Sequence, residues 1–187
     1  MDSENKVNNK QILVGHEKFV EMISAEQIRA RIVELGKQIT EDYKAKLPIF
    51  ISVLNGSFMF LSDLIKEVDL HCEIDFIKLS SYGDQKISSG KVKTLKELNA
   101  DISERHVIIV EDIVDTGLSI SYLEKLLKEH NPASTKVASL LVKPESLKYD
   151  IKVDYVGFEI PNKFVIGYGL DYAQKYRNLS SIYVLSE

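Results

Sequence analysis

Three carboxylates that could do chemistry, Glu111, Asp112 and Asp115, lie within five positions directly after the apolar run His106–Val110. The next residues, Thr116–Ser119, combine hydroxyl groups with a glycine at the expected start of a helix. Free backbone N–H groups at a helix N-terminus, with a glycine that lets a ligand approach, favour a phosphate. Carboxylates instead suit vicinal hydroxyls or a metal ion. The combination indicates a sugar-phosphate site.

A simpler interpretation of the same residues is an acidic, solvated turn that leads into a capped helix, because acidic residues are common near helix starts. The chain has no Gly-Lys-Ser/Thr of a P-loop and no dinucleotide-binding glycine fingerprint. The residues alone leave both interpretations open.

The elements that must position these residues follow from hydrophobic spacing and turn residues. Ser24 and Gln27 form a capping-box pair at the start of a helix whose apolar positions run to Tyr43, before Pro48. Further helices are expected at 58–66 and 119–131, and strands at 49–54, 72–79, 106–110, 137–142, 155–158 and 182–185. This alternation predicts an α/β fold with a parallel sheet covered on both faces. Ligands of such sheets bind at the carboxyl ends of the strands.

Composition excludes some classes of protein. The chain has 187 residues, a net charge of −4 and an isoelectric point near 5.7, which argues against a general nucleic-acid binder. No apolar run is long enough to cross a membrane. Residues 1–11 are polar and lack the apolar core of a signal peptide, so we expect a loose arm there and a cytoplasmic protein. Cys72, the single cysteine, excludes an intramolecular disulfide and is expected to be a buried, inert thiol.

The segment Val107–Gly117 resembles the phosphoribosyl-diphosphate motif of the type I phosphoribosyltransferase family. The resemblance runs from about residue 12 to the end of the chain and is strongest to the hypoxanthine-guanine branch of that family. The supporting blocks are Val53–Phe60, Leu79–Asp84, Leu141–Lys143 and Val156–Tyr172. The resemblance implies one domain over 1–187, with a central parallel sheet flanked by helices at about 37–150. It also implies a small hood lobe built from the N-terminal segment and about 151–187.

The resemblance assigns roles around the sugar and its phosphates. Glu111 and Asp112 would hold the ribose hydroxyls, and Asp115 would be the general base for the purine N7 proton. Thr116, Gly117, Leu118 and Ser119 would bind the 5′-phosphate, although some relatives have lysine where this chain has Leu118. Asn55 and Gly56, after a cis peptide bond, and Arg177 would contact the diphosphate; relatives often have lysine at the Asn55 position. Mg²⁺ would be the cofactor, held by Glu111, Asp112 and Asp171.

The resemblance also assigns the purine site. Lys143 would donate to the 6-oxo group, Phe164 would stack on the base, and Val165 would contact its edge through the backbone, with Asp171 close by. Ser81 and Tyr82 would belong to a lid that excludes water. Without the resemblance, Lys143 would be interpreted as a surface lysine and Phe164 as part of the core.

The implied reaction joins hypoxanthine or guanine to 5-phosphoribosyl diphosphate, giving IMP or GMP and diphosphate in purine salvage. A homodimer or homotetramer is expected, with no nucleic-acid or membrane partner. Two alternatives stay open. One is a non-catalytic regulator that senses nucleotides or binds RNA, because fold alone does not determine function; the other is an enzyme that prefers xanthine.

Overall fold

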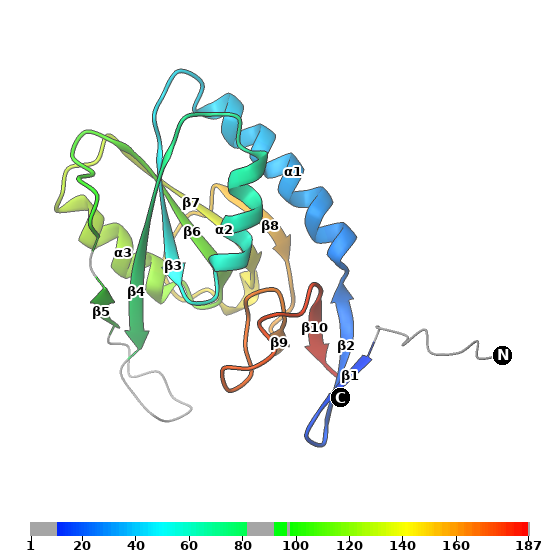
Figure 1. Cartoon of the computed structure of the whole chain (residues 1–187). Coiled ribbons are helices and arrows are strands. Elements are labelled where there is room, and N and C mark those ends of the chain that lie inside the picture. Colours follow the sequence, from blue (N-terminus) through cyan, green and yellow to red (C-terminus); the bar gives the residue numbers. More distant parts are fainter. Residues whose placement is uncertain (1–10, 82–91, 97, 187) are drawn as a thin grey trace.

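The structure, a computed structural model, describes residues 11–81, 92–96 and 98–186. Its centre is a six-stranded sheet in the order β5-β4-β3-β6-β7-β8, seen at the left of Figure 1. The strands are β3 (Ile49–Leu54), β4 (Glu73–Ser81), β5 (Val92–Lys96), β6 (His106–Val114), β7 (Ser134–Val142) and β8 (Tyr155–Glu159). All neighbours pair in parallel except β5, which is antiparallel to β4. The predicted parallel sheet is therefore confirmed.

Helices cover both faces of this sheet. Residues of α1 (Ala25–Asp42) and α2 (Phe58–Leu64) pack in one apolar cluster with Phe50, Ile108 and Val110 of β3 and β6. Ile120, Leu123 and Leu127 of α3 (Leu118–Lys128) pack in a second cluster with the alternate residues of the same strands. Alternation of side chains along each buried strand places one apolar set on each face. Helices α1 and α2 thus cover one face of the sheet and α3 covers the other (Figure 1).

The capping box at the start of α1 is confirmed. Ser24 Oγ accepts a hydrogen bond from the Gln27 backbone N–H at 3.3 Å, and Gln27 Oε1 accepts one from the Ser24 N–H at 2.9 Å. The pair satisfies two backbone donors that the helix leaves free at its first turn. Two short 3-10 turns, Ile65–Glu67 after α2 and Pro144–Ser146 after β7, complete the helical elements of the described chain.

A second sheet forms the hood. It is antiparallel, in the order β1-β2-β10-β9, and joins β1 (Gln11–Val14) and β2 (Glu17–Ile23) to β9 (Val165–Ile166) and β10 (Ile182–Leu185). Its small core consists of Val14, Phe19, Ile166 and Tyr183. The β1–β2 hairpin brings the N-terminal segment beside the C-terminal one, as Figure 1 shows in blue and red. No strand was predicted at residues 11–23 or 165–166, whereas the strand predicted at 182–185 is confirmed as β10.

Three expectations need correction. Strand β6 continues through Glu111 and Asp112 to Val114, so these carboxylates lie within a strand and not in a loop after it. The reason is backbone pairing: β7 stays in register with β6 as far as Val114, opposite Val142. Helix α3 begins one residue earlier than predicted and ends at Lys128, three residues before Asn131. Cys72 is partly exposed, although it packs on the α1–α2 cluster and burial raises its thiol pKa.

No helix within residues 11–81, 92–96 and 98–186 is long and apolar enough to span a membrane.

Candidate functional site

The turn between β6 and α3 leaves the first turn of α3 without a side-chain cap. Gly117, the residue before the helix, has φ +83°, a left-handed conformation that favours glycine. A β-carbon there would also come within 3.0 Å of Ile151 Cγ1. The Thr116 side chain accepts only a long bond, at 3.4 Å, from the Leu118 N–H. Because Gly117 offers no capping oxygen, backbone donors at this helix end remain available to an anion.

A cavity of about 90 Å³ lies at the start of α3 and is lined by Glu111 and residues 113–120. Glu111 is 8% exposed, and its Oε2 atom has no hydrogen-bond partner within the described part of the chain. Burial, reinforced by the charge of Asp112, raises the pKa of Glu111 well above its usual value. A buried polar atom without a partner is unusual in a folded protein, so this carboxyl group is a candidate contact for a ligand in the cavity.

Asp112 points to the opposite face of β6, because side chains alternate along a strand. It lies against Gly56, where an added β-carbon would be only 1.5 Å from Asp112 Oδ2. Burial raises the pKa of Asp112 to about 6. The hydrogen bond from the Ile113 N–H and the charge of Arg177 lower this pKa, but burial has the larger effect. The two adjacent acids of the motif therefore face different parts of the site.

The turn after β3 is the point where the central sheet meets the hood. The Leu54–Asn55 peptide bond is cis, as the resemblance implied. Gly56 follows, with the Asp112 carboxylate on one side and Gly169 of the hood on another. A β-carbon on Gly169, which has φ +98°, would lie 2.0 Å from the Gly56 carbonyl oxygen. Glycine is thus required at position 169, where a β-carbon would meet backbone, whereas a β-carbon at position 56 would displace the Asp112 side chain.

The hood segment that follows β9 holds Arg177 in a network of its own. Arg177 Nη2 lies 2.7 Å from Asp171 Oδ1, and Arg177 Nη1 donates to the Gly169 carbonyl at 2.7 Å. Asp171 Oδ2 accepts from the Gln174 N–H at 2.8 Å, and the Gln174 side chain accepts from Arg177 at 3.1 Å. Arg177 and Asp171 both act electrostatically on Asp112. Residues distant in the sequence therefore share one charged cluster.

Lys143 and Asp115 form an ion pair. Lys143 Nζ donates to Asp115 Oδ2 at 2.8 Å, and the lysine side chain is 9% exposed whereas that of the aspartate is 46% exposed. Lys143 follows the last residue of β7, and its backbone N–H donates to the Val114 carbonyl at 2.9 Å. The neighbouring strands β6 and β7 bring both groups to the carboxyl edge of the sheet, where α/β proteins bind ligands.

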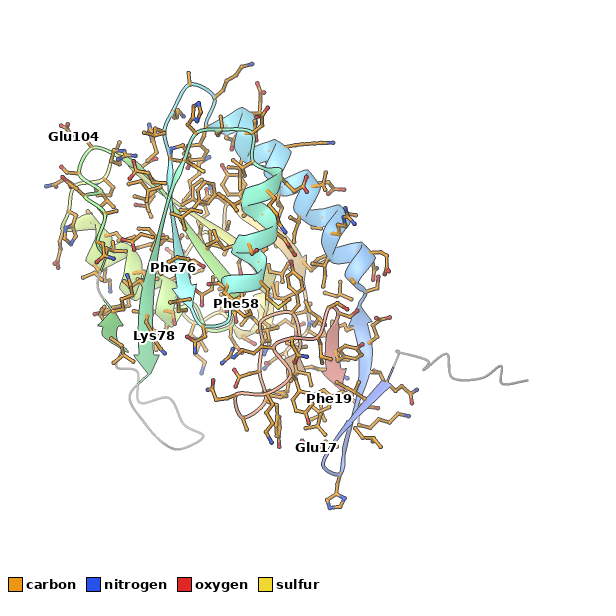
Figure 2. All side chains as sticks on the ribbon, viewed as in Figure 1. Glu17, Phe19, Phe58, Phe76, Lys78 and Glu104 are labelled. Atoms are coloured by element: carbon orange, nitrogen blue, oxygen red, sulfur yellow. The ribbon has the colours of Figure 1, made fainter. Side chains whose placement is uncertain are left out.

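Phe164 belongs to a group of three aromatic rings in the hood. Its centroid lies 6.2 Å from that of Phe19 and 5.8 Å from that of Tyr172, both in edge-on arrangements. Phe19 is fully buried, whereas Phe164 is 46% exposed. Figure 2 shows Phe19 in the hood, on β2. Phe164 thus keeps a free surface for a planar ligand, and the next residue, Val165, is buried in β9.

The remaining predicted residues are less informative. Ser81 is the last residue of β4, at the carboxyl edge of the sheet, and Tyr82 lies outside the described residues.

Within the described ranges, no group of three or more His, Cys, Asp or Glu side chains converges as a metal site. Glu111, Asp112 and Asp171 therefore do not form an all-protein metal cage. That fits Mg²⁺, which usually binds through one or two carboxylates together with water and phosphate oxygens.

Three residues near these groups were missed by sequence reasoning. Gly169 lies in the block Val156–Tyr172 that supports the resemblance, but no role was assigned to it. Tyr172 ends the same block and Phe19 lies outside it; their contacts with Phe164 were not predicted, because these contacts depend on the pairing of the hood strands.

Comparison with known proteins places this arrangement in a family. The family model described as "Phosphoribosyl transferase domain" matches residues 20–173. The hypoxanthine-guanine phosphoribosyltransferase of Bacillus subtilis is 48% identical over 88% of this chain and 91% of that protein. A crystal structure of a hypoxanthine-guanine phosphoribosyltransferase from Bacillus anthracis is 44% identical with a TM-score of 0.85, over 89% of this chain and 98% of that one.

A hypoxanthine phosphoribosyltransferase structure from Staphylococcus aureus covers 99% of this chain and 97% of its own, with a TM-score of 0.87 and 38% identity. The likeness therefore includes the hood as well as the central sheet. The chain belongs to the hypoxanthine-guanine branch of the phosphoribosyltransferase family and is an enzyme of that glycosyl-transferring type.

Proposed function

We propose that this enzyme joins its two substrates at the carboxyl ends of β6 and β7, with Asp115 as the general base and Lys143 as the donor to the purine 6-oxo group. The observation that carries this assignment is the 2.8 Å contact between Lys143 Nζ and Asp115 Oδ2. In a 6-oxopurine, O6 and N7 lie side by side on one edge of the base. A donor and an acceptor that already touch are close enough together to meet both atoms.

The reaction transfers the 5-phosphoribosyl group from phosphoribosyl diphosphate to hypoxanthine or guanine. Asp115 holds or takes the N7 proton as the new bond forms, which is general-base catalysis. Lys143 selects an accepting 6-oxo group, since the 6-amino group of adenine is a donor. Phe164 stacks on the base, as its exposed ring allows, and the Val165 backbone contacts the edge of the base.

The sugar phosphate occupies the start of α3 in this proposal. Thr116, Gly117, Leu118 and Ser119 bind the 5′-phosphate through backbone N–H groups and hydroxyls at a helix end without a side-chain cap. Glu111 reaches the ribose hydroxyls from the cavity it lines, and its Oε2 atom without a partner supports such a contact. Leu118 adds no charge, so the backbone has to supply most of the attraction.

The diphosphate lies between the β3 turn and the hood. Asn55 and Gly56 contact it through their backbone, and Arg177 supplies a positive charge. Mg²⁺, held by Asp171, Asp112 or Glu111 together with substrate oxygens, would neutralise charge on the leaving diphosphate. The carboxylate donor set supports this choice of ion, because Mg²⁺ prefers oxygen ligands. Ser81 and Tyr82 complete the proposal as part of a lid that excludes water.

The proposed roles require turnover by the purified protein. Mixed with Mg²⁺, phosphoribosyl diphosphate and hypoxanthine or guanine, it should form the nucleoside monophosphate. A protein that binds nucleotide or RNA without turnover would instead be a regulator. Competition among guanine, hypoxanthine and xanthine would identify the preferred base and test the alternative of a xanthine enzyme.

The proposal includes the cytoplasm as the site of action and a homodimer or homotetramer as the assembly. Light scattering coupled to size-exclusion chromatography measures the assembly directly, and a monomer at working concentration would contradict it.

A further inference from the structure

A buried tyrosine connects the hood to the helix that follows the β3 turn. Tyr168 Oη donates to Asp63 Oδ2 at 2.5 Å, and the other carboxylate oxygen of Asp63 accepts from Lys66 Nζ at 2.5 Å. Tyr168 is 5% exposed, and Asp63 belongs to α2. Burial and the adjacent carboxylate raise the Tyr168 pKa far above its usual value, so the hydroxyl stays a donor at any ordinary pH. Neither residue contacts the base or the phosphate in the proposed function.

Tyr168 is the middle residue of an unusual turn. Gly167, Tyr168 and Gly169 have φ values of +97°, +50° and +98°, and such left-handed conformations are uncommon for a residue with a large side chain. The Gly169 N–H donates to the Arg177 carbonyl at 2.9 Å, and the Gly169 carbonyl accepts from the Arg177 guanidinium at 2.7 Å. The backbone of this turn is therefore the support on which the Arg177 side chain rests.

The same turn also touches the β3 loop. Gly169 approaches the Gly56 carbonyl so closely that a β-carbon would lie 2.0 Å from it. Gly56 stands two residues before the start of α2, and α2 carries Asp63 near its other end. These contacts form a ring. The β3 loop leads into α2, Asp63 of α2 accepts a hydrogen bond from Tyr168, and Gly169, the next residue, contacts the Gly56 carbonyl in the β3 loop. Any shift of the hood turn would therefore move Arg177 relative to the β3 loop.

We infer that the Tyr168–Asp63 hydrogen bond is a positioning contact that fixes the hood turn, with Arg177 and Asp171, at the distance from Gly56 that binding of phosphoribosyl diphosphate requires. The inference rests on the proposed diphosphate contacts of Arg177 and Gly56. It assigns Tyr168 and Asp63 mainly to the binding of phosphoribosyl diphosphate, since Lys143 follows β7 and the Phe164 ring packs on Phe19 of β2 as well as on Tyr172.

The test is Tyr168→Phe, which keeps the ring and its packing and removes only the donor. We expect the KM for phosphoribosyl diphosphate to rise on the order of tenfold, because a hydrogen bond to a charged acceptor contributes at least that factor when it holds a geometry. The KM for guanine should stay within about twofold. In the double variant with Asp63→Asn the two effects should not add, since both changes break the same contact.

The chain offers a matched control in Tyr155. Its hydroxyl also donates to an aspartate, Asp42, at 2.6 Å, and Tyr155 is 1% exposed. This bond lies at the start of β8, at the opposite edge of the sheet from the carboxyl ends of the strands. Tyr155→Phe should therefore lower the Tm without changing the KM of either substrate. A second readout is the rise in Tm that phosphoribosyl diphosphate and Mg²⁺ produce without purine, which should shrink in Tyr168→Phe alone.

Arg177→Ala distinguishes failure of the inference from failure of the proposed diphosphate site. If Arg177→Ala raises the KM for phosphoribosyl diphosphate and Tyr168→Phe does not, Tyr168 is only a structural anchor and the inference is overturned. If Arg177→Ala has no effect, the proposed diphosphate contact itself is wrong. An equal rise of both KM values in Tyr168→Phe would also overturn the inference, because it would indicate a general loss of structure.

Discussion

Replacing Asp115 by asparagine tests the centre of the proposed mechanism. Asparagine keeps the volume of the side chain and an oxygen that accepts from Lys143 Nζ, which lies 2.8 Å from Asp115 Oδ2. It cannot take a proton from the purine. General-base catalysis typically contributes about 10² to 10⁴-fold in rate, which corresponds to about 3–5 kcal/mol of transition-state stabilisation. We therefore expect kcat to fall by two to four orders of magnitude, a range set by the same principle.

The structure also limits how much this change affects folding and substrate binding. The Asp115 side chain is 46% exposed, so solvent weakens its ion pair with Lys143, and the loss in folding stability should be about 1 kcal/mol. Because asparagine fits the same space, the KM of each substrate should change by no more than a few-fold. Thermal unfolding and steady-state kinetics, followed by monophosphate formation, measure these effects separately.

Glu145→Gln is a suitable control because it removes one negative charge from an exposed residue of the turn that follows Lys143. It should leave kcat unchanged. If Asp115→Asn retained kcat within a factor of about three, far outside the range for general-base catalysis, Asp115 would have no base role. A large fall in both variants would instead point to the overall charge of this edge and would refute the reasoning in the same way.

Other changes test the remaining groups of the site and the fold. Lys143→Met should lower kcat/KM for hypoxanthine by about 10- to 100-fold, the contribution of a charge-assisted hydrogen bond, and unchanged selection against adenine in a competition assay would contradict its role. Gly56→Ala places a β-carbon 1.5 Å from Asp112 Oδ2, so kcat/KM for phosphoribosyl diphosphate should fall about 100-fold through misplaced groups; near-normal kinetics would mean that the loop adapts. Phe164→Leu removes a ring that is 46% exposed and should raise the purine KM roughly fivefold, as loss of about 1 kcal/mol of stacking implies, whereas an unchanged purine KM would show that the ring does not stack on the base. Burial tends to raise the pKa of Asp75, but three backbone N–H groups and a lysine ammonium bind its carboxylate and hold the pKa below the usual 3.8. Asp75→Asn should therefore cost about 2–3 kcal/mol at pH 7, and the difference in Tm from the unchanged protein should shrink as the pH falls below about 4, where the carboxylate becomes protonated; a difference independent of pH would exclude the charge as its cause.

Much of the central sheet could be predicted because its signals are local. Strand β3 was predicted with its correct ends, since an apolar, β-branched run between Pro48 and Asn55 has few other interpretations. The capping box of α1 is equally local. Strand β6 was predicted too short, because Glu111 and Asp112 look like loop residues until the parallel partner β7 is known.

The hood was the least predictable part. The strand predicted at 182–185 is confirmed as β10, but β1, β2 and β9 were not predicted, and β2 pairs with β10 across more than 150 residues of sequence. The contacts of Phe164 with Phe19 and Tyr172, and of Tyr168 with Asp63, depend on this pairing. Sequence reasoning named Phe164 only through the family resemblance.

The sequence by itself determined the residue types at the site: the carboxylates of the β6 segment, the glycine turn before α3 and the lysine after β7. Only the tertiary structure decided which part of the site each of these side chains faces. Alternation along β6 turns Glu111 toward the cavity at the start of α3 and Asp112 toward Gly56. Strand pairing brings Lys143 to Asp115. The physical reason is that composition and spacing specify which chemistry a chain carries, whereas distances of a few ångströms between remote residues are set by the packing of the whole fold.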